Sequence, residues 1–185
     1  MRIFTAVIFA LVVSPLVAAD DSLIRIDPIL SQATFKVSLR VPIPAEGRFK
    51  TVNGELRQLP DFHQSVHVIL DARELNMSGP PWVQRVTQSP QFLNSAKFPI
   101  IDFQSTPFSN QLLLSGGEIK GILSIRGLAK EVVFTINPSL CRQPGVTCPI
   151  MANGRLNRHD FEMSAYRWGL HDEVQFAFQL KFIDE

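Results

Sequence analysis

Two segments near opposite ends of the chain alternate strictly between apolar and polar residues. Residues 32–39 (QATFKVSL) carry an apolar side chain at every second position, and residues 173–182 (EVQFAFQLKF) repeat the pattern. Successive side chains of a β-strand point to opposite faces, so a period of two is typical of a strand with one buried face. The sequence therefore predicts β-sheet at both ends of the fold.

Six further segments have strand character and are bounded by Gly, Pro or Asn. They are residues 47–56, 65–70, 100–106, 118–125, 130–136 and 152–157. About eight short strands with hardly any helix predict an all-β domain, either an antiparallel barrel or a sandwich. Gly and Pro spacing does not separate the two. An eight-stranded barrel has an interior just wide enough for packed side chains or one slender ligand.

Aromatic usage is strongly biased toward phenylalanine. The chain has 14 Phe but only one Tyr and two Trp, so most of its aromatic surface lacks a polar group. Strand alternation turns a set of apolar side chains inward: Phe35, Val37, Phe103, Leu123, Phe134, Phe176 and Phe178. Such side chains either fill a core or line an apolar tunnel, and both alternatives stay open.

Helical character is confined to residues 80–96. PPWVQRVTQ has Pro where a first helical turn tolerates it, and SPQFLN offers Ser89 as an N-cap followed by Pro. We expect two short helices that cap one end of the barrel. Phe92 and Leu93 would then point onto the barrel opening.

The N-terminus has the features of a secretory signal. Arg2 precedes an apolar stretch, and VAA stands directly before Asp20. A Ser-Pro pair interrupts the apolar run before the roughly 20 residues that a membrane anchor needs. We expect a signal peptide at residues 1–19 and a single exported domain at residues 20–185.

An exported protein enters an oxidising compartment, where its two cysteines can form a disulfide bond. Cys141 and Cys148 flank RQPGVT, whose Pro-Gly pair favours a turn that brings the two sulfurs together. We expect a disulfide bond in this loop. A redox or metal pair is less well supported, because the spacing is C-x6-C rather than C-x-x-C.

Charge and residue spacing argue against several other functions. The formal net charge is +1, which provides no basic surface for nucleic acid. His63 and His67 would lie about 13 Å apart on a strand, too far to share a metal. Asp160 and Glu162 are more typical of a solvated turn than of an acid-base pair. The sequence also lacks a G-x-S-x-G motif, so we expect neither a metal site nor enzyme activity.

Five motifs together resemble the YceI-like polyisoprenoid-binding proteins. QFLNSAKFPIIDFQST resembles one signature of this family, in which Phe, Asn, Lys and an aromatic-Pro pair precede a strand. GILSIRGLAKEVVF resembles a second, a Gly-x-Leu strand followed by a turn Gly, Lys and a β-branched strand. IDPILSQATFKV, GRFKTVNGEL and GRLNRHDFEM are supporting motifs. The similarity runs in family order from Ile26 to Phe182.

The resemblance implies a lipocalin-like antiparallel β-barrel, export to the periplasm, and an apolar tunnel for a polyisoprenoid, isoprenoid quinone or fatty-acid-like chain. It implies no enzyme activity, no metal and no cofactor other than the bound lipid. The residues expected to line the tunnel are Phe35, Val37, Phe92, Leu93, Phe103, Leu123, Phe134, Phe176 and Phe178.

Recognition of a polar head group is less clearly encoded. Family members often carry an Arg-x-x-x-His-Leu-like run before the first signature, whereas this chain has Arg85 followed by Val86 and Thr87. Arg126 and Lys130 straddle a predicted tight turn and, with Arg85, form a candidate positive rim for an anionic head group. A merely soluble hairpin explains these charges equally well.

We therefore predict a periplasmic carrier that holds a long apolar lipid and contacts the inner membrane or a membrane redox protein transiently. The alternative is a barrel with a filled core that serves as a partner-binding accessory to a membrane redox or envelope-stress system. Lipid recovered with the protein would separate the two. The oligomeric state is left open, with a dimer among the alternatives.

Overall fold

The computed structural model describes residues 22–40 and 45–183, so the expected signal peptide lies outside the described residues. The described chain is mostly strand. The strands are β1 (Leu23–Arg25), β2 (Gln32–Leu39), β3 (Ala45–Phe49), β4 (Asn53–Leu59), β5 (His63–Asp71), β6 (Leu75–Met77), β7 (Ile100–Ser105), β8 (Phe108–Ser109), β9 (Gly117–Ile125), β10 (Leu128–Ile136), β11 (Ile150–Asn157) and β12 (Leu170–Leu180). The helices are α1 (Pro81–Gln88), α2 (Leu112–Ser115) and the 3-10 helix η1 (Arg158–Phe161).

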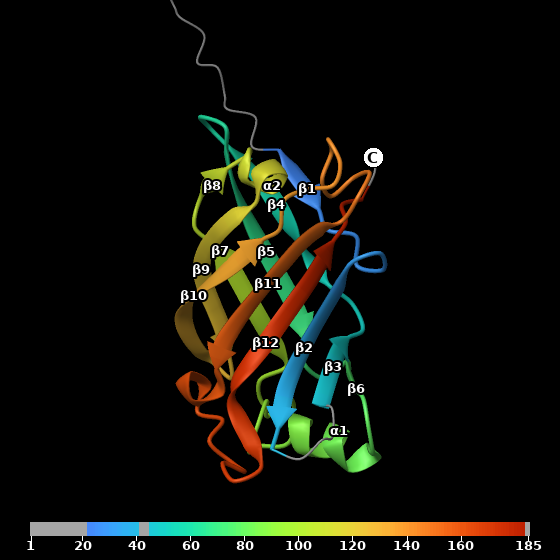
Figure 1. Cartoon of the computed structure of the whole chain (residues 1–185), viewed down its shortest axis with the longest axis vertical. Coiled ribbons are helices and arrows are strands. Elements are labelled where there is room, and N and C mark those ends of the chain that lie inside the picture. The colour runs from blue at the N-terminus through green and yellow to red at the C-terminus, as the bar shows by residue number, and fades with distance from the viewer. Residues whose placement is uncertain (1–21, 41–44, 184–185) are drawn as a thin grey trace, which may run out of the picture.

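The strands form one antiparallel sheet that curls around the long axis of the molecule (Figure 1). The strand order is β1-β4-β5-β7-β9-β10-β11-β12-β2-β3-β6, and β8 pairs with β5. An isolated bridge between Ile26 and Phe182 joins the continuation of β1 to the end of β12. The predicted lipocalin-like antiparallel barrel is confirmed.

The described chain has twelve strands where the sequence predicted about eight. Three of the additional strands, β1, β6 and β8, are too short to show an alternating pattern. The fourth arises because residues 47–56 divide into β3 and β4. Gly54 follows the division with φ of 147°, and a Cβ atom there would lie 2.0 Å from the carbonyl oxygen of His67. Only glycine fits this close approach of β4 to β5.

Alternation along the long strands builds the core. In β12 the buried side chains are Val174, Phe176, Phe178 and Leu180, and the residues between them are exposed. Full burial of each such side chain stabilises the fold by about 1.5–3 kcal/mol. All four belong to a single apolar cluster that runs through the barrel.

One half of the barrel interior is filled with packed rings. The ring of Phe134 contacts Phe103 edge to face at 5.0 Å between centroids and contacts Phe178 in the same manner at 5.4 Å. Leu123 is buried beside Phe103 as its cross-strand neighbour. Gly154 leaves room for this packing, because a Cβ atom there would lie 2.4 Å from the Phe134 ring.

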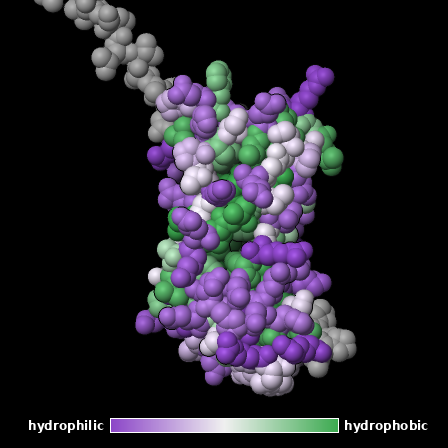
Figure 2. All heavy atoms as spheres, turned by 60° about the vertical axis from the view of Figure 1, so that its left-hand side comes forward, coloured by the Kyte–Doolittle hydropathy of each residue, from purple (hydrophilic) through white to green (hydrophobic). Residues whose placement is uncertain are grey.

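The strands β10 and β11 separate over part of the barrel wall. Their ladder comprises the three pairs Phe134–Gly154, Thr135–Asn153 and Ile136–Ala152, whereas β10 pairs with β9 along its whole length. Figure 2 brings this side forward and shows apolar residues in the middle of a largely polar surface. Outward-facing Ile122 and Val133 are exposed on β9 and β10.

Only the first of the two expected capping helices forms. Ser89 terminates α1 instead of starting a second helix, because its N–H donates to the carbonyl of Val86 at 3.1 Å. Residues 89–97, the turn segment, form successive turns. Asn94 adopts a left-handed φ of 49°, and the N–H of Leu93 donates to the carbonyl of Thr87 at 3.0 Å. The prediction of a second helix is therefore wrong, although the turn segment does cover the end of the barrel.

Cys141 and Cys148 form the predicted disulfide, with their Cα atoms 6.1 Å apart. This loop and α2 lie at the upper end of Figure 1, whereas α1 and the turn segment lie at the lower end. Within the described ranges, no helix combines the length and the apolar character that a membrane crossing requires.

Candidate functional site

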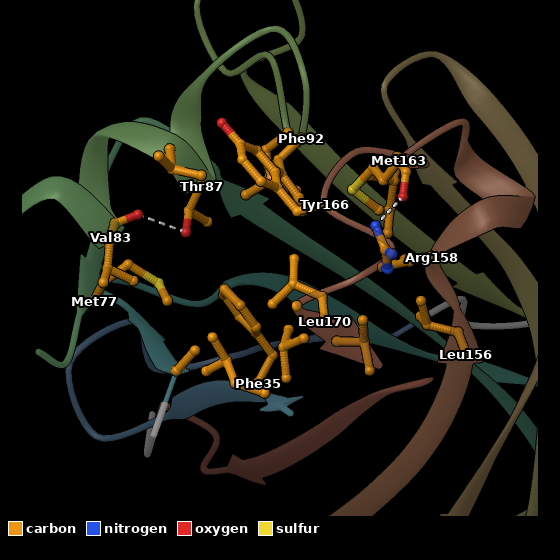
Figure 3. A pocket seen from close by; sticks show the side chains of 18 of the residues that line it. Phe35, Met77, Val83, Thr87, Phe92, Leu156, Arg158, Met163, Tyr166 and Leu170 are labelled. Carbon is orange, nitrogen blue, oxygen red and sulfur yellow. Dashed lines mark hydrogen bonds between the residues drawn. The ribbon is translucent and has the colours of Figure 1, made fainter. Parts of the chain in front are cut away.

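An apolar cavity of about 380 Å³ lies beneath α1 and the turn segment (Figure 3). Its wall is formed by side chains of β2, β3, β6, β7, β9, β11 and β12. The end of the cavity is covered by α1, the turn segment and residues 162–169, here called the mouth loop. The hydroxyl of Thr87 faces this wall but donates to the carbonyl of Val83 at 2.9 Å. The volume falls in the range of small-molecule pockets, about 300–1,000 Å³.

The structure brings five of the nine predicted tunnel residues onto this wall. Phe35 and Val37 come from β2, Phe176 from β12, and Phe92 and Leu93 from the turn segment. The other four, Phe103, Leu123, Phe134 and Phe178, lie in the packed half of the barrel and do not line the cavity. All nine point inward, and the part that the five play in ligand binding stays a prediction.

The turn segment and the mouth loop meet over the cavity. The ring of Phe92 stacks on Tyr166, with 5.8 Å between centroids and 8° between the ring planes. Figure 3 shows this pair at the edge of the cavity. Arg126 Nη1 donates to the carbonyl of Phe92 at 2.7 Å and to the carbonyl of Glu162 at 3.2 Å. Arg126 therefore ties the two covering segments together.

The three residues of the candidate positive rim do not line the cavity. Arg85 is exposed on α1, and Lys130 is exposed on β10. The guanidinium of Arg126 is engaged by backbone carbonyls. The arginines that do line the wall are Arg40 and Arg158, neither of which belongs to the predicted rim.

Arg158 is a buried cation in the cavity wall, with only 1% of its surface exposed. Nη1 donates to the carbonyls of Met163 and Ala165 at 2.6 and 2.7 Å, and Nε donates to the carbonyl of His171 at 3.1 Å. Nη2 reaches Asp172 Oδ1 at 3.4 Å. Burial lowers the pKa of Arg158, and the charge of Asp172 opposes this shift. The guanidinium thus fastens the mouth loop and the start of β12 to the barrel (Figure 3).

Asp172 is held in its ionised form by two partners. Its Oδ1 is 2.7 Å from His159 Nε2 and 3.4 Å from Arg158 Nη2. The hydrogen bond with His159 is the main reason that the pKa of Asp172 is lowered. Through these contacts Arg158, His159 and Asp172 support the mouth loop.

A pattern in the sequence could have identified Arg158. Ile150, Ala152 and Leu156 are buried on one face of β11, and one further step of the same alternation, two residues along the chain, leads to Arg158. The charged neighbours in RHDFEM instead suggested a solvated turn. Asp160 and Glu162 are indeed exposed, but Arg158 continues the inward face.

Aromatic residues other than Phe stand at the opening of the cavity. Trp82 on α1 and both Tyr166 and Trp168 in the mouth loop line the cavity while remaining exposed to solvent. The opening, here called the mouth, therefore lies between α1 and the mouth loop. Trp82 on a short helix and Tyr166 and Trp168 in a loop follow no common periodic pattern, so no sequence signal predicts that they lie together.

Metal-binding side chains do not cluster in residues 22–40 and 45–183, where no three His, Cys, Asp or Glu residues are placed to share an ion. His67 instead pairs with Asp102 at 2.5 Å, joining β5 to β7. Both side chains are about one-third exposed and lie away from the cavity wall.

Solved structures share this fold at low sequence identity. BcnA from Burkholderia cenocepacia matches 84% of this chain and 98% of its own, with a TM-score of 0.68 and 18% identity. A polyisoprenoid binding domain from Saccharophagus degradans, implicated in plant cell wall breakdown, matches 90% of this chain and 100% of its own, with a TM-score of 0.63 and 11% identity. The Campylobacter jejuni YceI protein matches 75% of this chain and 85% of its own, with a TM-score of 0.58 and 20% identity.

Sequence comparison gives a more direct assignment. Among curated protein sequences none matches this chain. The YceI-like domain model matches residues 25–182, which include strands β2 to β12, the last residue of β1 and the whole cavity wall. The curled antiparallel sheet agrees with that match, and the chain belongs to the YceI-like domain family.

Proposed function

We propose that the chain is a periplasmic carrier that binds the hydrocarbon chain of a polyisoprenoid or a similar long lipid in its cavity. The observation that carries this proposal is the apolar cavity itself, enclosed by a barrel and covered by two segments that contact each other through few side chains. Membership of the YceI-like family and the polyisoprenoid binding domain among the structural neighbours support it. The signal sequence expected at residues 1–19 supports export.

Burial of apolar surface would supply the binding energy. Each methylene group removed from water contributes about 0.8 kcal/mol, offset by the ordering of the lipid chain. Phe35 and Phe176 face the cavity from the side of the packed half, and their rings lie 5.8 Å apart. We place the lipid tail against these rings, because the wall there is apolar. The polar head then lies toward the mouth, near water.

Binding of this kind needs no covalent step. The hydroxyl of Thr87 is occupied by a backbone carbonyl, and Arg158 is held by four protein acceptors. Neither group is free to act as a nucleophile or general base. The proposal is therefore carriage or sequestration of a lipid.

Native mass spectrometry of protein isolated from its own host tests the proposal directly. We expect a bound species of lipid mass that organic extraction removes. Extracted protein should then take up a fluorescent fatty-acid probe. Protein that carries no lipid and rejects the probe would favour the alternative, a filled barrel that binds a partner.

Phe92→Ala should accelerate release of bound lipid by about five- to tenfold, because it removes part of the apolar surface that covers the cavity. Lys97→Ala is the matched control, since Lys97 is exposed in the same turn segment. Stopped-flow displacement of the fatty-acid probe measures both rates. Equal rates for Phe92→Ala and the unmodified protein would show that the lipid leaves by another route.

A further inference from the structure

All the Trp and Tyr residues of this chain gather at one place. The sequence contains two Trp and one Tyr, and Trp82, Tyr166 and Trp168 all lie at the mouth. Their exposed fractions are 46%, 40% and 82%. Among the described residues neither indole N–H has a hydrogen-bond partner, and Tyr166 OH donates to Gln91 Oε1 at 3.2 Å. Side chains with an apolar ring and a polar tip are those that concentrate where a bilayer meets water.

Cationic side chains surround these aromatic residues. Arg40 lines the mouth, Arg85 lies on α1, Lys97 lies in the turn segment, and Arg167 stands between Tyr166 and Trp168 in the chain. None of the four cations forms an ion pair within the part of the chain that the structure describes. Within η1 and the mouth loop, the acidic side chains that form no ion pair with the described residues are Asp160 and Glu162, so the four cations outnumber them.

We propose that the mouth docks on the surface of an anionic phospholipid bilayer, with the indole rings of Trp82 and Trp168 inserted at the interface. The negative potential of such a surface attracts Lys and Arg side chains, and the aromatic rings add apolar burial. The inference rests on the proposed lipid carriage and adds the partner from which the cavity is loaded. Docked in this way, the opening faces the bilayer, and a lipid tail passes into the cavity without crossing water.

The opposite end of the barrel also exposes apolar side chains but has a different chemistry. Phe62 and Leu140 protrude from loops there with exposed fractions of 84% and 97%. Their rings and chains carry no polar tip, and Asp61 directly precedes Phe62. Negative charge next to an apolar loop disfavours contact with an anionic surface. Arg142 lies two residues after Leu140, so the charge at this end is mixed, whereas both Trp residues and the Tyr lie at the mouth. The aromatic type therefore selects the mouth end, and the opposite end supplies matched controls.

Vesicle binding tests the docking surface. The exported protein is mixed with vesicles of phosphatidylcholine alone or with added phosphatidylglycerol, and binding is followed by co-sedimentation. We expect binding to the anionic vesicles, a blue shift of the Trp emission, and at least a tenfold loss of binding when the salt concentration is raised to about 1 M. Since both Trp residues of the chain lie at the mouth, the emission reports on this end alone.

Two sets of variants locate the contact. Lys97→Glu combined with Arg167→Glu, and separately Trp168→Ala, should each weaken binding to anionic vesicles at least tenfold. Phe62→Ser combined with Leu140→Ser should bind like the unmodified protein. Loss of binding in this second set, or binding without a shift in Trp emission, would place the contact at the other end and overturn the proposal.

Failure of docking is distinguishable from failure of lipid carriage. Protein that arrives from its host with lipid bound but ignores anionic vesicles would refute docking and leave the carrier function standing. Protein that binds the vesicles through its mouth but never contains lipid would refute carriage. If the protein bound vesicles of phosphatidylcholine alone as well as anionic vesicles, the proposed preference for an anionic surface would be refuted.

Discussion

Val37→Asp is expected to lower the affinity for lipid at least 100-fold while the barrel stays folded. Val37 is half-buried on β2 and lines the cavity, where its cross-strand neighbours Ala45 and Val174 are also wall residues. Water in the empty cavity can solvate a carboxylate at this position. A lipid chain would displace that water, and an ionised carboxylate without hydrogen-bond donors is unfavourable in an apolar environment by several kcal/mol. Asp is too short to reach solvent as Lys or Arg would.

Two further variants make the result specific. Ser38→Asp introduces the same charge at the next residue of β2, on the exposed outer face, and should bind lipid normally. Val37→Asn keeps the size and removes the charge, so it should lose less affinity than Val37→Asp. Titration with a fluorescent fatty acid gives the affinity, and thermal unfolding shows that each variant folds. Normal binding by folded Val37→Asp would mean that the lipid does not occupy this cavity.

The barrel was predictable because alternation is a local property of each strand. Segments such as 32–39 and 173–182 specify which side chains face inward whatever they pair with. Alternation does not specify the height of a residue along the barrel axis. Phe176 and Phe178 share one face of β12, yet Phe176 lines the cavity and Phe178 packs against Phe134 in the filled half. Only the register of neighbouring strands makes that distinction.

The capping segment shows where local signals mislead. Ser89 followed by Pro has the form of a helix start, but Ser89 instead closes α1, and the chain folds back so that Leu93 can bond to Thr87. A second helix is not formed because the chain turns back over the cavity. Arg126, in the distant β9–β10 turn, stabilises this turned-back conformation through its hydrogen bond to Phe92. The hydrogen bond between Arg126 and Phe92 joins residues 34 positions apart, so a short segment of the sequence does not predict it.

The charged residues illustrate the same limit. Arg85, Arg126 and Lys130 were grouped because of their predicted positions at one end, but the cavity wall contains Arg40 and Arg158 instead. The sequence predicts a solvated turn at Asp160 and Glu162, and Arg158 precedes this turn. Burial of Arg158 depends on carbonyls of Met163 and Ala165 in the mouth loop. Alternation along β11 can place Arg158 on the inward face, but it does not identify the distant carbonyls that stabilise the buried guanidinium.

Arg158→Met is expected to lower the free energy of unfolding by about 3–5 kcal/mol, because it leaves the carbonyls of the mouth loop without donors at a buried site. Met has a similar length and is apolar, so the loss reports on the hydrogen bonds and not on a large cavity. The mouth loop should also become more mobile, since Met163 and Ala165 lose their anchor. Amide hydrogen exchange in residues 162–169 should then accelerate more than exchange in β12.

Arg155 offers a matched control for this prediction. It lies three positions earlier, on β11, is exposed, and forms a surface ion pair with Glu173 at 3.6 Å. Arg155→Met should lower the free energy of unfolding by no more than about 1 kcal/mol, as is usual for exposed pairs. Arg158→Lys should fall between the two, because an ammonium group keeps the charge but cannot reproduce the planar fork of donors. Urea denaturation of the three variants would show this order. If Arg158→Met instead matched Arg155→Met, and exchange in the mouth loop were unchanged, the backbone alone would hold the loop over the cavity and the guanidinium would have no supporting role.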